Sequence, residues 1–194
     1  MRLIGLTGSI GMGKSATAGM FRASGLPVFD ADAAVHAIYR AAPTTEFREH
    51  FPDALVADMI DRDRLARLMV ADPSRLKRLE SIIHPLVGAA RAAFLAEHRT
   101  RNRPAVVLDI PLLLETGSAD AVDVVVVASA PPDAQRSRVL ARPGMTPEKF
   151  DMILSKQMPD VEKRRRAHYV IDTGRGFDHA RRQVSDLLRA LGAS

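Results

Sequence analysis

The 194-residue chain contains no cysteine and no tryptophan, and only two tyrosines. Without cysteine it can form neither a disulfide framework nor a thiolate metal site. Aromatic residues make up 5% of the chain, which is few for a surface that stacks on nucleic-acid bases. The net charge of +5 suits small polyanions as well as nucleic acid, but the basic residues form no continuous tract. We therefore expect small anionic ligands and no nucleic-acid partner.

Long apolar runs are also lacking. Because no stretch of about 18 or more apolar residues is present, we expect no membrane span and no membrane partner. No signal-peptide pattern precedes the first apolar segment, which begins at Arg2. These absences predict a cytoplasmic location, and nothing in the sequence indicates an oligomeric state.

The most specific pattern lies at residues 8–15, which read G-S-I-G-M-G-K-S. This P-loop pattern stands between an apolar segment at 2–7 and a helix-compatible segment at 16–23, as the motif requires. Glycines let successive N–H groups point at phosphate oxygens, and the following helix N-terminus favours anions. Lys14 is expected on the β- and γ-phosphates of a nucleoside triphosphate, and Ser15 on Mg²⁺. The expected nucleotide-binding residues are Gly8, Gly11, Met12, Gly13, Lys14, Ser15 and Ala16.

Apolar segments alternate with helix-like segments along the rest of the chain. Five strands are predicted, at about 2–7, 26–29, 105–110, 122–127 and 169–172. Such strands are typical of an α/β fold with a parallel sheet covered on both faces. Ligands in these sheets bind beyond the carboxyl ends of the strands. Acidic residues are expected there, namely Asp30, Asp32, Asp109 and Asp172.

Residues 61–101 contain no strand pattern and read as helices. A break is expected at Asp72-Pro73, and a further helix is expected to begin at His84-Pro85, since proline is tolerated in a first helical turn. This stretch exceeds an ordinary crossover between strands, so we interpret it as a helical insertion. Later helices are predicted from 131, over 147–157, and from 177 to the end, whereas 46–60 has no clear pattern.

The motifs favour a small-molecule kinase over other P-loop proteins. A guanine-reading N-K-x-D motif is absent, because the single asparagine, Asn102, is followed by Arg103. No strand ends in the adjacent acids typical of a mechanical ATPase. A kinase needs a carboxylate near the acceptor hydroxyl and arginines for the transferred phosphoryl group. Asp32 and the arginines of 136–142 are candidates for these parts.

Six motifs lie in order along nearly the whole chain: GLTGSIGMGKS (5–15), DADAAVH (30–36), HPLV (84–87), LDIPLLLE (108–115), QRSRVLAR (135–142) and AHYVIDT (167–173). Together they resemble the dephospho-CoA kinase family, which performs the last step of coenzyme A synthesis. The resemblance implies ATP-dependent phosphorylation of the ribose 3′-hydroxyl of dephospho-CoA, giving coenzyme A and ADP.

The resemblance also implies the domain organisation. A single P-loop kinase domain would span 1–194, with its core at about 1–40, 104–130 and 168–194. A helical CoA-binding insertion would lie at about 61–101 and an arginine-bearing lid at about 131–160. The chain departs from the family at Ser9, Met12, His168 and Thr173, where the family usually has glycine, serine, aspartate and asparagine. The last departure leaves the adenine contact of that turn open.

Asp32 matches the second acid of the D-A-D motif and is the expected catalytic carboxylate. It would orient the 3′-hydroxyl and accept its proton. The alternative is a helix N-cap, for which aspartate is well suited and which Asp30 could supply instead. Three further residues are expected on the substrate side, with purely structural roles as the alternative: His36, His84 and Glu115.

Lys14, Arg138 and Arg142 complete the expected catalytic set. Arg138 and Arg142 are four residues apart, so one helical face would present both, and a solvated surface is the alternative. Asp109 would hold magnesium through water together with Ser15, or it would cap the following loop. Two other functions remain open: a kinase for another acceptor, such as a nucleotide or sugar acid, and a P-loop regulator without chemistry.

Overall fold

The computed structural model describes residues 1–193. Two compact units divide the chain, the first made of residues 1–29 and 98 onward, and the second of residues 30–97. The unit boundary at residue 30 falls at the end of a strand, and the return at 97–98 falls inside a helix. The second unit is therefore one continuous segment of the chain, inserted between two segments of the first unit.

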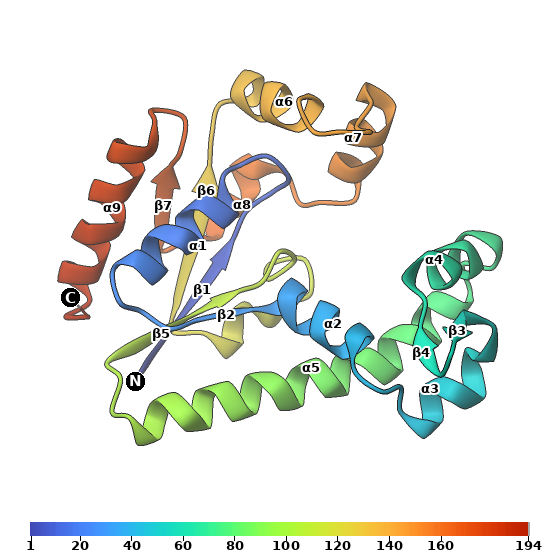
Figure 1. The fold of residues 1–194 in the computed structure, drawn as a ribbon. Coiled ribbons are helices and arrows are strands. Elements are labelled where there is room, and N and C mark those ends of the chain that lie inside the picture. The colour runs from blue at the N-terminus through green and yellow to red at the C-terminus, as the bar shows by residue number, and fades with distance from the viewer. Residues whose placement is uncertain (194) are drawn as a thin grey trace. The chain divides into compact units, whose positions relative to one another are not determined.

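A parallel sheet forms the centre of the first unit (Figure 1). The strand order is β2-β5-β1-β6-β7, with β1 between β5 and β6. The predicted α/β class and the five predicted strands are confirmed. The strands are β1 (Arg2–Thr7), β2 (Val28–Asp30), β5 (Ala105–Asp109), β6 (Val124–Ser129) and β7 (Tyr169–Asp172).

Alternate residues of β6 pack into different cores on the two faces of the sheet, as the strand period of two requires. Val124 and Val126 join the core that includes Phe21 of α1 (Lys14–Ala23) and Val184 of α9 (Phe177–Ala190). Val125 and Val127 join a second core with Leu113 and Leu114 from the loop after β5. With both faces covered, the exposed carboxyl edge of the sheet is left for the P-loop and for ligands.

The segment between β6 and β7 contains three helices: α6 (Pro132–Leu140), α7 (Pro147–Ser155) and α8 (Asp160–Arg166). Thr146 begins α7 by accepting a hydrogen bond from the Lys149 N–H group. We did not predict α8. The expectation that one helical face presents both Arg138 and Arg142 is wrong, because α6 ends at Leu140. Pro143 disfavours helical geometry at Arg142, the residue before it.

The second unit begins with α2 (Ala31–Arg40) and continues through short elements that the sequence did not reveal. These are α3 (Thr45–His50), the 3₁₀ helix η1 (Pro52–Ala54), β3 (Leu55–Val56) and β4 (Met59–Ile60). The β3–β4 hairpin turns at Ala57 and Asp58, which both have positive φ angles. Such turns usually contain Asn-Gly or Asp-Gly, so Ala-Asp gave no recognisable turn signal.

Helices α4 (Arg62–Ala71) and α5 (Arg75–Thr100) follow, with the predicted break between them. The expected helix start at His84-Pro85 is wrong, because Pro85 lies inside α5. An interior proline costs roughly 3 kcal/mol. Ile82 and Ile83 on this part of α5 are buried in a core with Phe47, and burying such side chains stabilises the continuous helix by a comparable amount.

Within residues 1–193, α5 has the length and apolar composition that could cross a membrane. A single helix of this kind is weak evidence, because helices of water-soluble proteins pass the same test. The helix contains Pro85, Arg91 and Glu97, and charged residues are costly at the centre of a bilayer. The absence of a membrane partner stays a prediction.

Candidate active site

The P-loop joins β1 to α1 at the carboxyl edge of the sheet. Gly13, the residue before α1, has φ +86°, and no side chain caps the helix. A β-carbon on Gly8 would lie 2.7 Å from the Ala128 carbonyl oxygen, so glycine is required there by close packing. The first N–H groups of a helix have no acceptor within the helix. At α1 they are left to bind an anion, which fits a phosphate.

Lys14, the first residue of α1, contacts a carboxylate from the neighbouring strand β5. Its Nζ donates to Asp109 Oδ1 at 2.7 Å, and the Asp109 side chain is only 3% exposed. Asp109 is paired with Leu6 in the register of β5 and β1, so the sheet itself places the carboxylate beside the loop. The ion pair holds Lys14 near the phosphate cradle. The magnesium role expected for Asp109 stays a prediction.

Arg138 of α6 contacts the P-loop and the turn after β7 rather than standing free. Its guanidinium donates to the Thr173 carbonyl oxygen at 2.8 Å and to Thr173 Oγ1 at 3.1 Å, and reaches the Gly11 carbonyl oxygen at 3.5 Å. The buried Thr173 hydroxyl donates to the Met12 carbonyl oxygen at 2.9 Å. Threonine at this position therefore connects the turn to the P-loop. The expected contact of Arg138 with phosphate stays a prediction.

The two other arginines of this segment are placed differently. Arg142 is exposed, and its side chain has no hydrogen-bond or ion-pair partner among residues 1–193. Arg136 lies over the Phe150 ring, 5.9 Å from its centroid, and 3.7 Å from Asp151. Arg136 therefore holds α6 against α7, whereas Arg142 is available to a ligand.

Glu115 forms an internal ion pair. Its Oε1 lies 2.8 Å from Nζ of the fully buried Lys163 and accepts a hydrogen bond from the Met158 N–H group at 3.0 Å. Burial alone would raise the pKa of Glu115, but the close Lys163 ammonium and the hydrogen bond from the Met158 N–H group outweigh it and lower the pKa below its ordinary value. These contacts favour a positioning role for Glu115, and its expected contact with substrate stays a prediction.

In the second unit, Asp30 and Asp32 have separate positions at the start of α2. Asp30 is the N-cap and accepts a hydrogen bond from the Ala33 N–H group at 2.9 Å. Asp32 is exposed on the first turn, and its carboxylate has no hydrogen-bond or ion-pair partner within residues 1–193. Asp32 is thus not needed as the cap. His36 is half-buried one turn later on α2, and His84 is exposed on α5.

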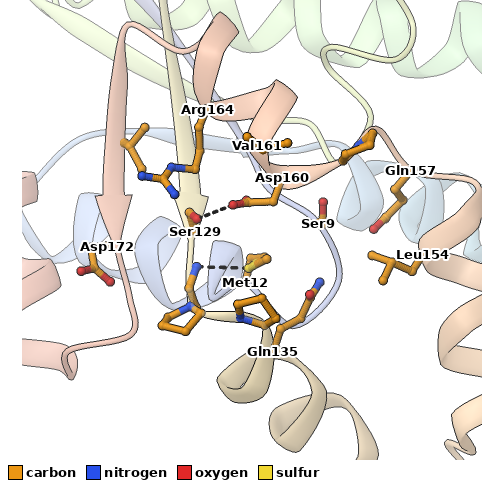
Figure 2. A pocket seen from close by; sticks show the side chains of 15 residues that line it. Ser9, Met12, Ser129, Gln135, Leu154, Gln157, Asp160, Val161, Arg164 and Asp172 are labelled. Carbon is orange, nitrogen blue, oxygen red and sulfur yellow. Dashed lines mark hydrogen bonds between the residues drawn. The ribbon is translucent and has the colours of Figure 1, made fainter.

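A cavity of about 690 Å³ lies beside the P-loop in the first unit (Figure 2). Ser9 and Met12 line it, which are two positions where the chain departs from the resembled family. The Met12 sulfur accepts a hydrogen bond from the Ala130 N–H group at 3.1 Å. Neither Lys14 nor Ser15 lines this cavity. It is therefore adjacent to the phosphate cradle and distinct from it.

Two residues that bind the P-loop and one buried lysine were not predicted from the sequence. Gln157 and Gln135 bind the Ile10 N–H group and carbonyl oxygen, and Lys163 is buried beside Glu115. Gln135 lies in the QRSRVLAR motif, in which the arginines were the predicted functional residues. Lys163 lies in a run of charged residues, a pattern typical of a solvated surface, so its burial had no sequence signal.

Comparisons with known proteins place the chain in a family. The sequence model of a family described as dephospho-CoA kinase matches residues 2–178. A relative named dephospho-CoA kinase, from Agrobacterium fabrum, is 51% identical over 193 residues and covers 100% of both chains. A solved structure from Thermus thermophilus has a TM-score of 0.83 at 36% identity, with 97% of this chain and 96% of that chain covered.

A solved dephospho-CoA kinase from Campylobacter jejuni has a TM-score of 0.73 at 22% identity, covers 97% of this chain and 96% of that chain, and shows the fold alone. The full-length relatives at about half identity do not favour a kinase of another acceptor. A P-loop with its lysine held at the sheet edge, six motifs in order and a match over most of the length agree: the chain belongs to the dephospho-CoA kinase family.

Proposed function

We propose that the chain transfers the γ-phosphoryl group of ATP to the ribose 3′-hydroxyl of dephospho-CoA, giving coenzyme A and ADP. The observation that carries the proposal is the P-loop with Lys14 held 2.7 Å from Asp109, in a chain of the dephospho-CoA kinase family. In the reaction, a bond forms between the 3′-oxygen and the γ-phosphorus. The bond from the γ-phosphorus to the β–γ bridging oxygen breaks, and its electron pair leaves with ADP.

The chain's own residues have separate roles in this step. Lys14 and the N–H groups at the start of α1 bind the β- and γ-phosphates and stabilise the charge of the transition state. Arg142, which has no partner among residues 1–193, supplies a further cation to the transferred group. Asp32 orients the 3′-hydroxyl and takes its proton. The D-A-D motif and the exposed carboxylate support this last role.

Magnesium fits the same residues. The part of the chain that the structure describes contains no group of three His, Cys, Asp or Glu side chains that could hold a metal ion. Mg²⁺ in kinases usually takes one or two protein oxygens and completes its shell with phosphates and water, so Ser15 and Asp109 would suffice. When bound, the ion neutralises charge on the phosphate oxygens.

On the basis of the family resemblance, we assign the binding of dephospho-CoA to the second unit, which includes the helical insertion. An apolar cavity of about 250 Å³ lies within this unit, lined by Ile38, Phe47, Ile83, Leu86 and others. Its lining suits the apolar part of a pantetheine arm better than a phosphate or a sugar. The cytoplasmic location stays part of the proposal.

Mass spectrometry of the products tests this function. Purified protein, Mg²⁺ and ATP should add one phosphoryl group to dephospho-CoA at the 3′-hydroxyl. AMP, which lacks the pantetheine arm, serves as the matched acceptor and should react much more slowly. Equal rates for both acceptors would support a nucleotide kinase instead. ATP binding with no phosphorylated acceptor would support a regulator.

A further inference from the structure

The backbone of Ile10 in the P-loop is bound by two glutamines from opposite ends of the arginine-bearing segment 131–160. Its N–H group donates to Gln157 Oε1 at 3.0 Å, and its carbonyl oxygen accepts from Gln135 Nε2 at 2.7 Å. Both side chains are labelled in Figure 2, where they approach the loop from different elements. Both contacts are made to the backbone of the loop, and the Ile10 carbonyl shares its peptide group with the N–H of Gly11, one of the expected nucleotide-binding residues.

The two glutamines belong to different parts of the segment. Gln135 is buried on α6, and Gln157 follows the end of α7. The helices are themselves joined, because Arg136 of α6 contacts Phe150 and Asp151 of α7. The glutamines therefore connect the backbone of Ile10 to a pair of helices that are already held together.

The neighbouring residue of the loop is also shaped by α6. Gly11 has φ +78°, and a β-carbon there would lie 2.5 Å from Val139 Cγ2 and 2.9 Å from the Gln135 carbonyl oxygen. The outer part of the loop thus packs closely against α6 and is hydrogen-bonded to it. Since the cradle for phosphate consists of backbone N–H groups, the orientation of each peptide in the loop determines how well they converge.

We propose that Gln135 and Gln157 are positioning residues that hold the two peptide groups on either side of Ile10 and thereby set the P-loop geometry for ATP. The chemistry differs between them. Gln157 acts as an acceptor, which a glutamate can replace. Gln135 acts as a donor, which an ionised glutamate cannot replace. The inference rests on the proposed kinase function only in that the nucleotide is ATP.

The test compares glutamate and methionine at both positions: Q157E, Q157M, Q135E and Q135M. The affinity of Mg²⁺ with a non-hydrolysable ATP analogue is measured by calorimetry, and KM is measured for ATP and for dephospho-CoA. Losing one hydrogen bond of this kind should weaken the affinity roughly 3- to 10-fold, with KM for ATP rising and KM for dephospho-CoA unchanged. Q157E should bind more tightly than Q157M, although its added charge opposes an anionic ligand. Q135E should bind no more tightly than Q135M.

Two exposed serines provide matched controls, Ser137→Ala on α6 and Ser155→Ala on α7, and both should bind the analogue as the parent chain does.

Hydrogen exchange gives a readout that a loss of global stability would not imitate. The Ile10 amide should exchange faster in Q157M than in Q135M at equal melting temperature. Parent-like affinity in both methionine variants, or glutamate failing equally at both positions, would overturn the proposal. Analogue binding does not depend on dephospho-CoA turnover, so it still decides the inference if the proposed function fails.

Discussion

The expected catalytic cations fall into two groups. Lys14 and Arg138 are held by contacts within the protein, Lys14 by Asp109 and Arg138 by Thr173. Arg142 has no side-chain partner within residues 1–193. Charges fixed in advance need no reorganisation when the transition state forms, whereas a free arginine can arrive with the substrate. We therefore predict a prepared cradle that Arg142 joins when the substrate binds.

Asp32→Asn tests the catalytic carboxylate. We expect kcat to fall roughly 10²- to 10⁴-fold, because a positioned base contributes about this much. The affinity for ATP should stay near that of the parent chain, since the P-loop is unchanged. Steady-state kinetics with dephospho-CoA, together with calorimetry of ATP binding, make the measurement. Comparable losses of kcat and ATP affinity would mean that Asp32 is structural.

Asp30→Ala is the matched control two residues away. Asp30 caps α2 through the Ala33 N–H group, and loss of an N-cap costs about 1 kcal/mol of stability. This variant should melt at a lower temperature, whereas Asp32→Asn should melt like the parent chain because Asp32 has no partner to lose. The two variants thus separate the alternatives that the D-A-D motif left open.

At the scale of elements, the Glu115–Lys163 ion pair joins the loop after β5 to α8. Glu115→Gln leaves the fully buried Lys163 ammonium without its counter-charge, and removing one partner of such a pair costs about 3 kcal/mol or more. We expect chemical unfolding at neutral pH to show this loss in the free energy of unfolding. If Glu115 only positions these elements, kinase activity should fall only as far as the loss of folded protein requires, and a larger fall would support its expected contact with substrate.

The same variant should change the acid limb of stability. The folded pKa of Glu115 is lowered from its ordinary value of 4.5, so the parent chain gains stability above pH 4.5 and loses it as the pH falls through the folded pKa. The difference in the free energy of unfolding between parent and variant should therefore shrink as the pH falls through the folded pKa. Glu162→Gln, which affects an exposed pair on α8, should change stability by no more than about 0.5 kcal/mol. A difference independent of pH would contradict the role of the Glu115 charge.

Elements with strong patterns were predictable, and those defined by tertiary packing were not. The strands of the sheet are short, apolar and separated by helices, so the alternation itself predicts them. The β3–β4 hairpin lacks usual turn residues, and α5 continues through Pro85 because Ile82 and Ile83 are buried. The P-loop residues were readable from spacing. The Gln135, Gln157 and Thr173 contacts were not, because they join residues more than 30 positions apart in the chain.

At the scale of the whole molecule, the P-loop and the D-A-D carboxylate belong to different compact units. Any kinase must avoid transferring phosphate to water, which competes with the acceptor hydroxyl. Enzymes meet this hazard by completing the site only when the acceptor binds. Arg142, exposed and unpaired among residues 1–193, is suited to such a late arrival.

ATP turnover without acceptor should therefore be far slower than turnover with dephospho-CoA. A sharper test uses dephospho-CoA that lacks the 3′-hydroxyl, which can bind but cannot be phosphorylated. If acceptor binding completes the site, this analogue should raise the slow hydrolysis of ATP above its basal rate, because water then occupies the place of the missing hydroxyl. Arg142→Ala should remove that stimulation while leaving basal hydrolysis unchanged. Equal ATP turnover with no acceptor, with the analogue and with dephospho-CoA would show that the site is complete from the start.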